Sequence, residues 1–248
     1  MESLGEKKPL RLLFVGAGGV GAYYAARLIM DGNSVVLTAR GGHLEAMKTR
    51  GLQVEHDQFS FKQPVCAVDQ ATLQRQYRCD DFDVLVLCLK SQDTASWLDS
   101  NSVWLAAGAT PVLSLQNGVE NEAVLSKLLG VNRVVGGLAV RIGAHIVSPG
   151  FVEAQGLCQI VLGAWPNAVV NEGLQGIVKR LADTFNASGI PTRAAVDIRH
   201  ELWKKLLVNN GVNPLSALTR KDTGFLTKHP HYRQVVYAAM QEVAAVSG

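Results

Sequence analysis

The sequence lacks several features that would place it in a special class of protein. No apolar run in its 248 residues reaches the length of a membrane span, and the first nine residues have no apolar signal-peptide core. We therefore expect a soluble, cytoplasmic protein. Its four cysteines form no C-x-x-C pair and have no histidine at metal-ligand spacing, so we expect reduced thiols and no metal site. They are Cys66, Cys79, Cys88 and Cys158.

An excess of charge of one sign is also missing. The formal net charge of +3 is small for this length, and lysine and arginine are scattered without a run. Nucleic acid and anionic membranes are therefore not expected as partners, whereas an anionic small molecule fits the slight excess of cations. The hydrophobic content of 48% is enough for one large domain or a domain and a half.

What the chain does contain is a glycine-rich turn after its first apolar run. Residues 12–15 read Leu-Leu-Phe-Val, and three glycines at G-x-G-x-x-G spacing follow. This pattern predicts a strand, a tight turn and a helix whose amino terminus binds the pyrophosphate of a dinucleotide. Gly16 would permit the turn, Gly18 the close approach of the pyrophosphate, and Gly21 the packing of helix on strand. The predicted cofactor-binding residues here are Gly16, Ala17, Gly18, Gly19, Val20 and Gly21.

The end of the second expected strand, residues 34–38, bears on which dinucleotide is bound. NAD sites usually place an Asp or Glu at this point, but the chain has Thr38-Ala39-Arg40 and no carboxylate before Glu45. A fixed cation suits a 2′-phosphate, which favours NADP(H) over NAD. The alternative is that Arg40 is an isolated, solvated cation.

Two further apolar runs, residues 82–89 and 111–115, predict central parallel strands with polar carboxyl ends. Ligands of open α/β sheets bind outside these ends. Lys90 is therefore a candidate contact to cofactor or substrate, and Asn117 a candidate contact on the nicotinamide side. Alternatively, Lys90 is a solvated loop lysine and Asn117-Gly118 an ordinary turn.

Later stretches predict additions to the sheet. Residues 133–164 are β-rich, and we expect four short strands there, separated by glycines and by the turn at residues 148–150. A hairpin around Gln63-Pro64 is expected within residues 59–68. We expect the domain that carries this sheet to span residues 9–196.

From residue 197 the pattern becomes helical, and we expect a second domain over residues 197–248. Asn209 and Asn213 follow Lys205 by four and eight residues, which places the three within roughly 80° on one side of a helix. Such a stripe could protonate an oxyanion and hold a polar substrate. Equally, it could be a solvated helix edge that ends at Asn213-Pro214.

Together these marks resemble the ketopantoate reductase (2-dehydropantoate 2-reductase) family over nearly the whole chain. The resemblance implies an α/β fold, with a Rossmann-type nucleotide-binding domain followed by a mostly helical carboxyl-terminal domain. It also implies that NADPH delivers hydride to a keto carbon while Lys205 protonates the carbonyl oxygen as general acid. The neighbouring Lys204 points about 100° away along the helix and serves as a control. The resemblance assigns substrate binding to Asn117, Asn209 and Asn213, and cofactor binding to Arg40, Lys90 and Asn117.

The sequence departs from this family at its carboxyl-terminal end. Family members continue for some tens of residues beyond Gly248 and there supply a serine and a glutamate of the site, to which no residue of this sequence is assigned. The helical domain is therefore expected to be incomplete relative to the family and to pair with a second copy of the chain.

We consider three functions, of which we predict the first, that of an NADP-dependent oxidoreductase, and keep the other two as alternatives. The first is reduction of ketopantoate to pantoate, a step of pantothenate (vitamin B5) and coenzyme A biosynthesis. The second is reduction of another 2-oxo acid or an imine by the same fold and cofactor. The third is a catalytically inactive paralogue that binds NADPH.

Overall fold

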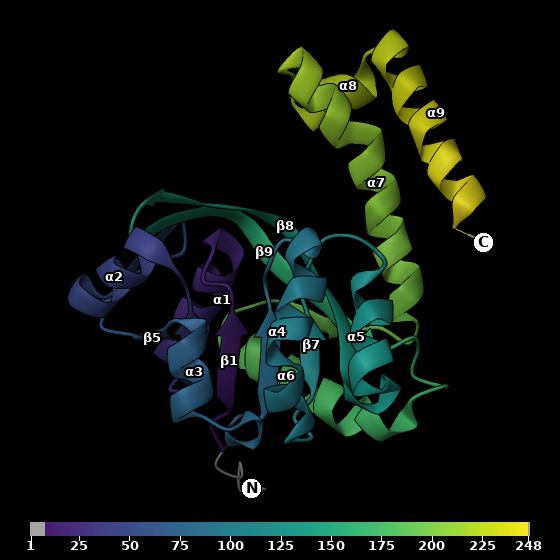
Figure 1. Ribbon diagram of the computed structural model, residues 1–248. Coiled ribbons are helices and arrows are strands. Elements are labelled where there is room, and N and C mark those ends of the chain that lie inside the picture. Colours follow the sequence, from purple (N-terminus) through teal and green to yellow (C-terminus); the bar gives the residue numbers. More distant parts are fainter. Residues whose placement is uncertain (1–7, 248) are drawn as a thin grey trace, which may run out of the picture.

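The computed structural model describes residues 8–247 of the chain. Residues 1–7, which belong to the amino-terminal segment considered above, and Gly248 lie outside the described residues. The described part forms a large sheet flanked by helices, followed by a group of helices that projects from it (Figure 1). This arrangement confirms the α/β class, with a Rossmann-type sheet before a mostly helical carboxyl-terminal part.

The first half of the sheet is parallel. Its strands lie in the order β5-β2-β1-β6-β7, each parallel to its neighbour. The apolar runs form such strands because helices cover both faces, and Leu12, Leu13 and Phe14 are completely buried. The strands are β1 (Arg11–Val15), β2 (Ser34–Thr38), β5 (Cys66–Val68), β6 (Val84–Leu87) and β7 (Val112–Ser114).

Helices connect these strands and form two apolar cores, one on each face. One core contains Leu28 of α1 and Phe185 of α6, and the other contains Leu98 of α4 and Leu125 of α5. The helices of this part are α1 (Gly19–Met30), α2 (Gly41–Arg50), α3 (Gln70–Gln76), α4 (Thr94–Ala106), α5 (Asn121–Leu129) and α6 (Gln175–Ala187).

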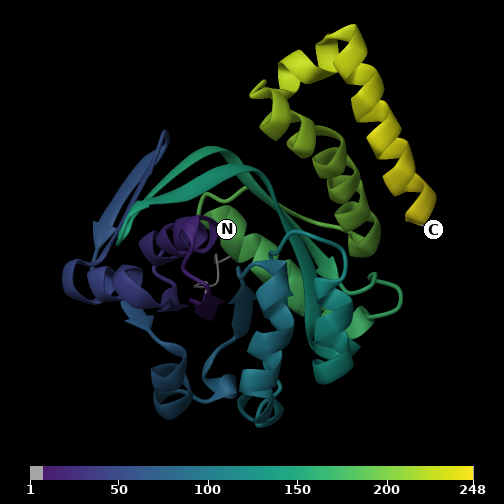
Figure 2. The same cartoon turned by 45° about the horizontal axis from the view of Figure 1, so that its top comes forward.

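Two long antiparallel strands extend the sheet beyond β7 and curve over α1 (Figure 2). They are β8 (Val134–Ser148) and β9 (Phe151–Ala164), joined by a tight turn at the predicted position. The expectation of four short strands is wrong, because Gly143 and Gly156 pair within the ladder, opposite Gln155 and Ile142, and both strands continue past them. β9 also pairs with β3 (Leu52–His56) and with β10 (Thr192–Ala194).

The expected hairpin around Gln63-Pro64 is also wrong. β4 (Phe59–Gln63) pairs antiparallel with β3, so the hairpin turn lies at residues 57–58. β5 instead pairs parallel with β2, at the opposite end of the strand order. Proline cannot donate a backbone hydrogen bond, and here Pro64 separates two strands of different partners.

The projecting part consists of α7 (Ile198–Thr219), α8 (Thr223–Lys228) and α9 (Pro230–Val246). Asp197 caps α7 by accepting a hydrogen bond of 2.8 Å from the backbone N–H of His200. The first turns of α7 pack on the sheet through buried Ile198 and Leu202. Beyond them the helices bury a small core of their own, made of Val212, Leu226 and Val236. Among residues 8–247, no helix combines the length and apolar character that crossing a membrane requires.

α7 does not end at Asn213-Pro214, as one interpretation of the sequence would have it. The helix continues to Thr219 and ends before Arg220, which has a left-handed φ of 56°. A proline inside a helix costs about 3 kcal/mol because it removes one hydrogen bond and crowds the preceding turn. Packing of Val212 and Leu215 in the small core offsets this cost.

Candidate functional site

The glycine-rich turn has the geometry that its sequence predicts at two of its three motif glycines. Gly16 has a φ of +99°, so it makes the sharp turn. A Cβ on Gly21 would lie 2.3 Å from the carbonyl oxygen of Gly16, so this glycine permits the close packing of α1. At Gly18 nothing lies within 4 Å of the position of a Cβ, and no side chain caps α1 there. The first N–H groups of α1 are thus open to an anion.

Gly19 has a role that the motif alone does not predict. A Cβ at this position would lie 2.5 Å from the carbonyl oxygen of Ala144 in β8. The backbone of the curved strand therefore lies directly against the start of α1, and only glycine leaves room for it. No sequence signal links these two segments, because the contact depends on the curvature of β8.

Side chains of β2 and α2 hold the turn in place. The hydroxyl of Thr38 accepts a hydrogen bond of 3.0 Å from the N–H of Gly16. Nδ1 of His43 accepts one of 3.0 Å from the N–H of Gly150, so Nε2 carries the proton and donates to the carbonyl of Ala17 at 2.9 Å. Burial lowers the pKa of His43, which favours the neutral ring that these two hydrogen bonds require. The sequence analysis missed this residue, whose two partners are distant in sequence.

The carboxyl ends of β6 and β7 carry a hydrogen-bonded network that fixes Asn117. Its backbone carbonyl oxygen accepts hydrogen bonds from the hydroxyl of Ser91 and from Nδ2 of Asn121, the latter at 3.0 Å. Buried Gln116 donates at 2.7 Å to Thr94, which in turn donates to Asn121 at 3.2 Å. The Asn-Gly dipeptide is therefore both a turn and a rigid support for the amide side chain.

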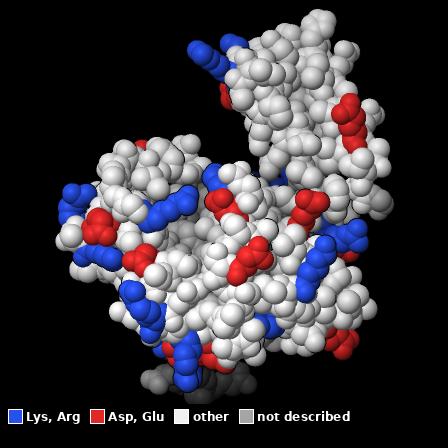
Figure 3. Space-filling model, viewed as in Figure 1, with Lys and Arg blue, Asp and Glu red and all other residues white. Residues whose placement is uncertain are grey.

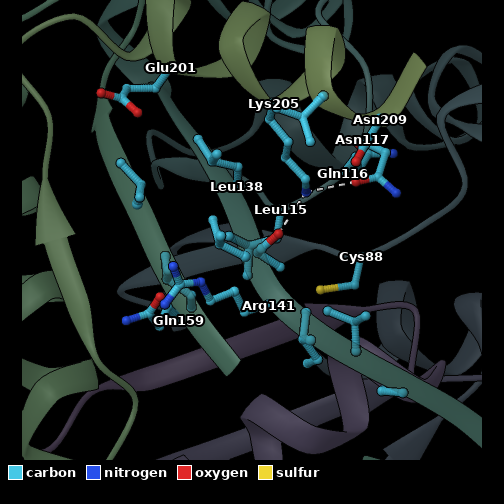
Figure 4. Close-up of a pocket in the computed structure, with 18 of the residues that line it drawn as sticks. Cys88, Leu115, Gln116, Asn117, Leu138, Arg141, Gln159, Glu201, Lys205 and Asn209 are labelled. Atoms are coloured by element: carbon cyan, nitrogen blue, oxygen red, sulfur yellow. Dashed lines mark hydrogen bonds between the residues drawn. The ribbon is translucent and has the colours of Figure 1, made fainter. Parts of the chain in front are cut away.

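Lys205 reaches from α7 to this edge of the sheet (Figure 4). Its ammonium group donates to Oδ1 of Asn117 at 2.8 Å and to the carbonyl oxygen of Ala139 in β8 at 2.6 Å. Because an ammonium group only donates, the oxygen of the Asn117 amide must face it. Desolvation by burial lowers the pKa of Lys205 to about 8. The ammonium group thus has a pKa well below that of a free lysine and a fixed position.

The preceding lysine has a different environment. Lys204 is exposed, and its amine lies 3.9 Å from Oε1 of Glu201. The same carboxylate accepts a hydrogen bond of 2.7 Å from Arg193 of β10. Within residues 8–247, Glu201 forms ion pairs with these two cations at the rim of the cavity and none with Lys205.

Lys205, Asn117 and the start of α1 with its glycine-rich turn line one cavity of about 1350 Å³ between the sheet edge and α7. A notch between the projecting helices and the rest of the molecule is visible in Figure 3. Asn209 and Asn213 line the cavity together with Lys205, as the helical spacing predicts, and Lys90 lines it from the end of β6. Arg40 does not line it; this exposed residue precedes α2 at the end of β2. Within residues 8–247, no group of three or more metal-ligating side chains is present.

The comparison with protein families decides the relationship. The model of the family described as ketopantoate reductase PanE/ApbA matches residues 12–167, and the model of its carboxyl-terminal domain matches residues 197–248. The chain belongs to the ketopantoate reductase family. It is therefore an oxidoreductase, as the sequence analysis predicts.

Individual members of the ketopantoate reductase family show the same relationship. The chain is 29% identical over 233 residues to a 2-dehydropantoate 2-reductase of Pyrococcus horikoshii, covering 94% of this chain and 72% of that protein. It is 31% identical over 252 residues to the 2-dehydropantoate 2-reductase of Mesorhizobium japonicum, covering 96% and 76%. The chain thus spans about three quarters of the length of these relatives.

Solved structures share the fold of this ketopantoate reductase family member. A 2-dehydropantoate 2-reductase from Geobacter metallireducens superposes with a TM-score of 0.82 at 28% identity, covering 96% of this chain and 75% of that one. A D-mandelate dehydrogenase superposes with a TM-score of 0.85 at 22% identity, covering 96% and 73%. The second likeness concerns the fold alone.

Proposed function

We propose that this chain reduces the ketone of a 2-oxo acid with NADPH, and that ketopantoate is its substrate and pantoate its product. This reaction would serve pantothenate and coenzyme A biosynthesis. The observation that carries the proposal is the partly buried ammonium group of Lys205, held by Asn117 and Ala139 at the edge of a cavity that also contains the glycine-rich turn. The names of the relatives supply the choice of ketopantoate.

The glycine-rich turn fits the dinucleotide. Gly18, Gly19 and Val20 line the cavity, and Gly18 leaves open the space that a side chain would fill. The uncapped N–H groups of α1 would bind the pyrophosphate. When bound, the nicotinamide ring would supply the hydride for the reduction. We propose that Lys90 and Asn117, which line the same cavity, also contact the cofactor.

Arg40 supports NADP(H) rather than NAD as the cofactor. It follows Thr38 by two residues, and Thr38 is bonded to the glycine-rich turn, so the end of β2 stands beside the proposed pyrophosphate site. An exposed guanidinium at this point suits a 2′-phosphate, which it can bind through two parallel hydrogen bonds.

Lys205 would act as the general acid. Two of its three N–H groups are used by Asn117 and Ala139, which leaves one for the carbonyl oxygen of the substrate. A pKa near 8 lets the group donate its proton readily at neutral pH while remaining mostly protonated before the reaction. Asn209 and Asn213, on the same side of α7, would hold polar groups of the substrate.

We propose different roles for the two domains. Residues 9–196 would bind NADP(H), and residues 197–248 would supply the substrate side of the site. The last strand, β10, ends at Ala194 and α7 begins at Ile198, which supports a boundary between them. Exposed apolar residues of α7 and α9, including Leu218 and Tyr237, support pairing with a second copy of the chain.

The test is oxidation of NADPH in the presence of ketopantoate, followed through the absorbance of the nicotinamide ring. We expect turnover with ketopantoate and weaker turnover with other 2-oxo acids of similar size. A higher kcat/KM for another oxo acid or an imine would replace the substrate but keep the chemistry. Tight NADPH binding without turnover of any of them would contradict the proposal.

A further inference from the structure

The ladder between β8 and β9 is interrupted where it passes the cavity. Regular pairing reaches Val140 opposite Gln159 and resumes at Ile142 opposite Gly156. One residue of β8, Arg141, therefore lies against two residues of β9. Such a bulge bends a strand and redirects the side chains at the bend.

The backbone at this bulge is strained. Arg141 has a φ of 53° and Cys158 a φ of 49°, both in the left-handed region, where a residue with a side chain costs roughly 1–2 kcal/mol. Gly156 also has a positive φ, and a Cβ there would lie 2.3 Å from the carbonyl oxygen of Arg141. These three residues lie at the bulge, and of the three Arg141 lines the cavity.

The side chains of the two residues with left-handed backbone, Arg141 and Cys158, lie in different environments. Cys158 is buried, and its Sγ lies 3.6 Å from Nε2 of His56 in β3. Arg141 is exposed and lines the cavity, and Figure 4 shows it beside Gln159, below the helix that carries Lys205. The bulge thus places a long cationic side chain in the site.

The charges around the cavity leave Arg141 without a carboxylate. The only acidic residue among the described lining residues is Glu201, which is shared by Arg193 at 2.7 Å and Lys204 at 3.9 Å. Lys205 donates to neutral oxygens. Within residues 8–247, Arg141 forms no ion pair. The cavity therefore has an excess of positive charge.

We propose that Arg141 binds the carboxylate of the substrate, an inference that rests on the proposed reduction of a 2-oxo acid. Arg141 follows Ala139 by two residues, about 7 Å along a strand, and the carbonyl of Ala139 holds the ammonium group of Lys205. In a 2-oxo acid the carboxylate is bonded directly to the keto carbon. A substrate whose keto oxygen meets Lys205 thus places its carboxylate within reach of the Arg141 guanidinium, which can bind it through two parallel hydrogen bonds.

The test compares an acid with its neutral amide in the wild type and in Arg141→Gly. Glycine adopts the left-handed backbone without strain, so we expect the variant to unfold at the same or a higher temperature. We expect KM for the 2-oxo acid to rise about 10- to 150-fold, which corresponds to the loss of a hydrogen bond to a charged group. KM for the corresponding amide and the Kd for NADPH should stay close to their wild-type values. Arg141→Lys should restore part of the preference for the acid.

Arg199→Gln provides the matched control. This exposed arginine of α7 does not line the cavity, so removing its charge should leave the preference for the acid unchanged. An unchanged ratio of acid to amide in Arg141→Gly would overturn the proposal. So would a weaker Kd for NADPH with an unchanged ratio, because Arg141 would then serve a phosphate of the cofactor.

A second measurement separates this inference from the proposed function. Calorimetry of a 2-hydroxy acid and of its amide, each added to the NADP⁺ complex, needs no turnover. If the wild type reduces no 2-oxo acid, the proposed function fails, and this measurement still decides about Arg141. Stronger binding of the acid in the wild type and its loss in Arg141→Gly would support carboxylate recognition. Equal binding of acid and amide by the wild type would contradict it.

Discussion

The two walls of the cavity are built in different ways. The sheet wall rests on two large apolar cores, in which residues such as Phe14 and Leu85 are completely buried. The helical wall beyond the first turns of α7 buries a small core of Val212, Leu226 and Val236, and it leaves Leu218 largely exposed. A rigid wall and a weakly packed wall thus meet at one site.

This difference shows how the reactive group is positioned. Lys205 belongs to the helical wall, but both hydrogen-bond acceptors of its ammonium group belong to the sheet wall, through Asn117 and Ala139. The helix supplies the amine, while the sheet fixes its place and partly shields it from water. The proposed chemistry therefore depends on contacts between the two walls more than on the stability of the helices themselves.

The largest expected effect comes from removing the amine at the junction. Lys205→Ala should lower kcat for NADPH oxidation by about 10²- to 10⁴-fold, the range associated with a general acid. NADPH binding, measured by fluorescence titration, should persist, because the glycine-rich turn lies on the other wall. The matched control is Lys204→Ala, since Lys204 is exposed and lies near Glu201. Equal losses in the two variants would contradict the special role of Lys205.

A smaller effect is expected at the end of β2, on the sheet wall alone. Arg40→Gln should raise KM for NADPH by about 10- to 150-fold while KM for NADH changes little, because a charged hydrogen-bond partner of the 2′-phosphate is lost. Steady-state kinetics with both cofactors measures the switch. Lys48→Gln on the helix that follows, α2, is the control, as this exposed lysine lies 3.7 Å from Glu45. A parallel rise with NADH would show that Arg40 supports the fold and does not select the cofactor.

The sequence predicts those features of the site that depend on residues close together in the chain. The turn at Gly16 and the packing at Gly21 depend on neighbouring residues, so the motif predicts them correctly. The stripe of Lys205, Asn209 and Asn213 depends only on helical periodicity, and all three line the cavity.

Contacts between distant segments could not be predicted in this way. The bond from Lys205 to Ala139 and the contact of Ala144 with Gly19 both depend on the curvature of β8, which has no local signal. For the same reason the ribbon of β8 and β9 was expected as four short strands. The continuation of α7 through Pro214 depends on packing against α8 and α9, which outweighs the local preference of the dipeptide.

The pH dependence of the reaction should report the titration of Lys205, at the junction of the two walls. Because burial lowers the pKa of Lys205 to about 8, the fraction of protonated amine falls above this pH. We expect kcat/KM for reduction to fall about tenfold per pH unit above pH 8, and oxidation of the 2-hydroxy acid to rise over the same range. Lys205→Arg should abolish this limb, since arginine stays protonated. An unchanged limb in that variant would assign the titration to another group.

The smallest effect on turnover is expected inside the sheet wall, at Glu122. This side chain is completely buried in the first turn of α5, and desolvation raises its pKa from 4.5 to about 7. The folded protein therefore holds a proton that the unfolded chain releases. The contribution to stability is complete below pH 4.5 and is lost as the pH rises through 7.

Glu122→Gln removes this titration and keeps the shape of the side chain. At pH 8 we expect the variant to be more stable than the wild type by about 1–3 kcal/mol, and at pH 5 the difference should be much smaller. Urea unfolding at the two pH values measures this difference in stability. The control is Glu120→Gln, because Glu120 lies two residues before Glu122 and is exposed. An equal change at both pH values would mean that Glu122 acts through packing. A change confined to pH 8 would show that the sheet wall holds a neutral carboxyl group, while the junction with α7 holds the reactive amine.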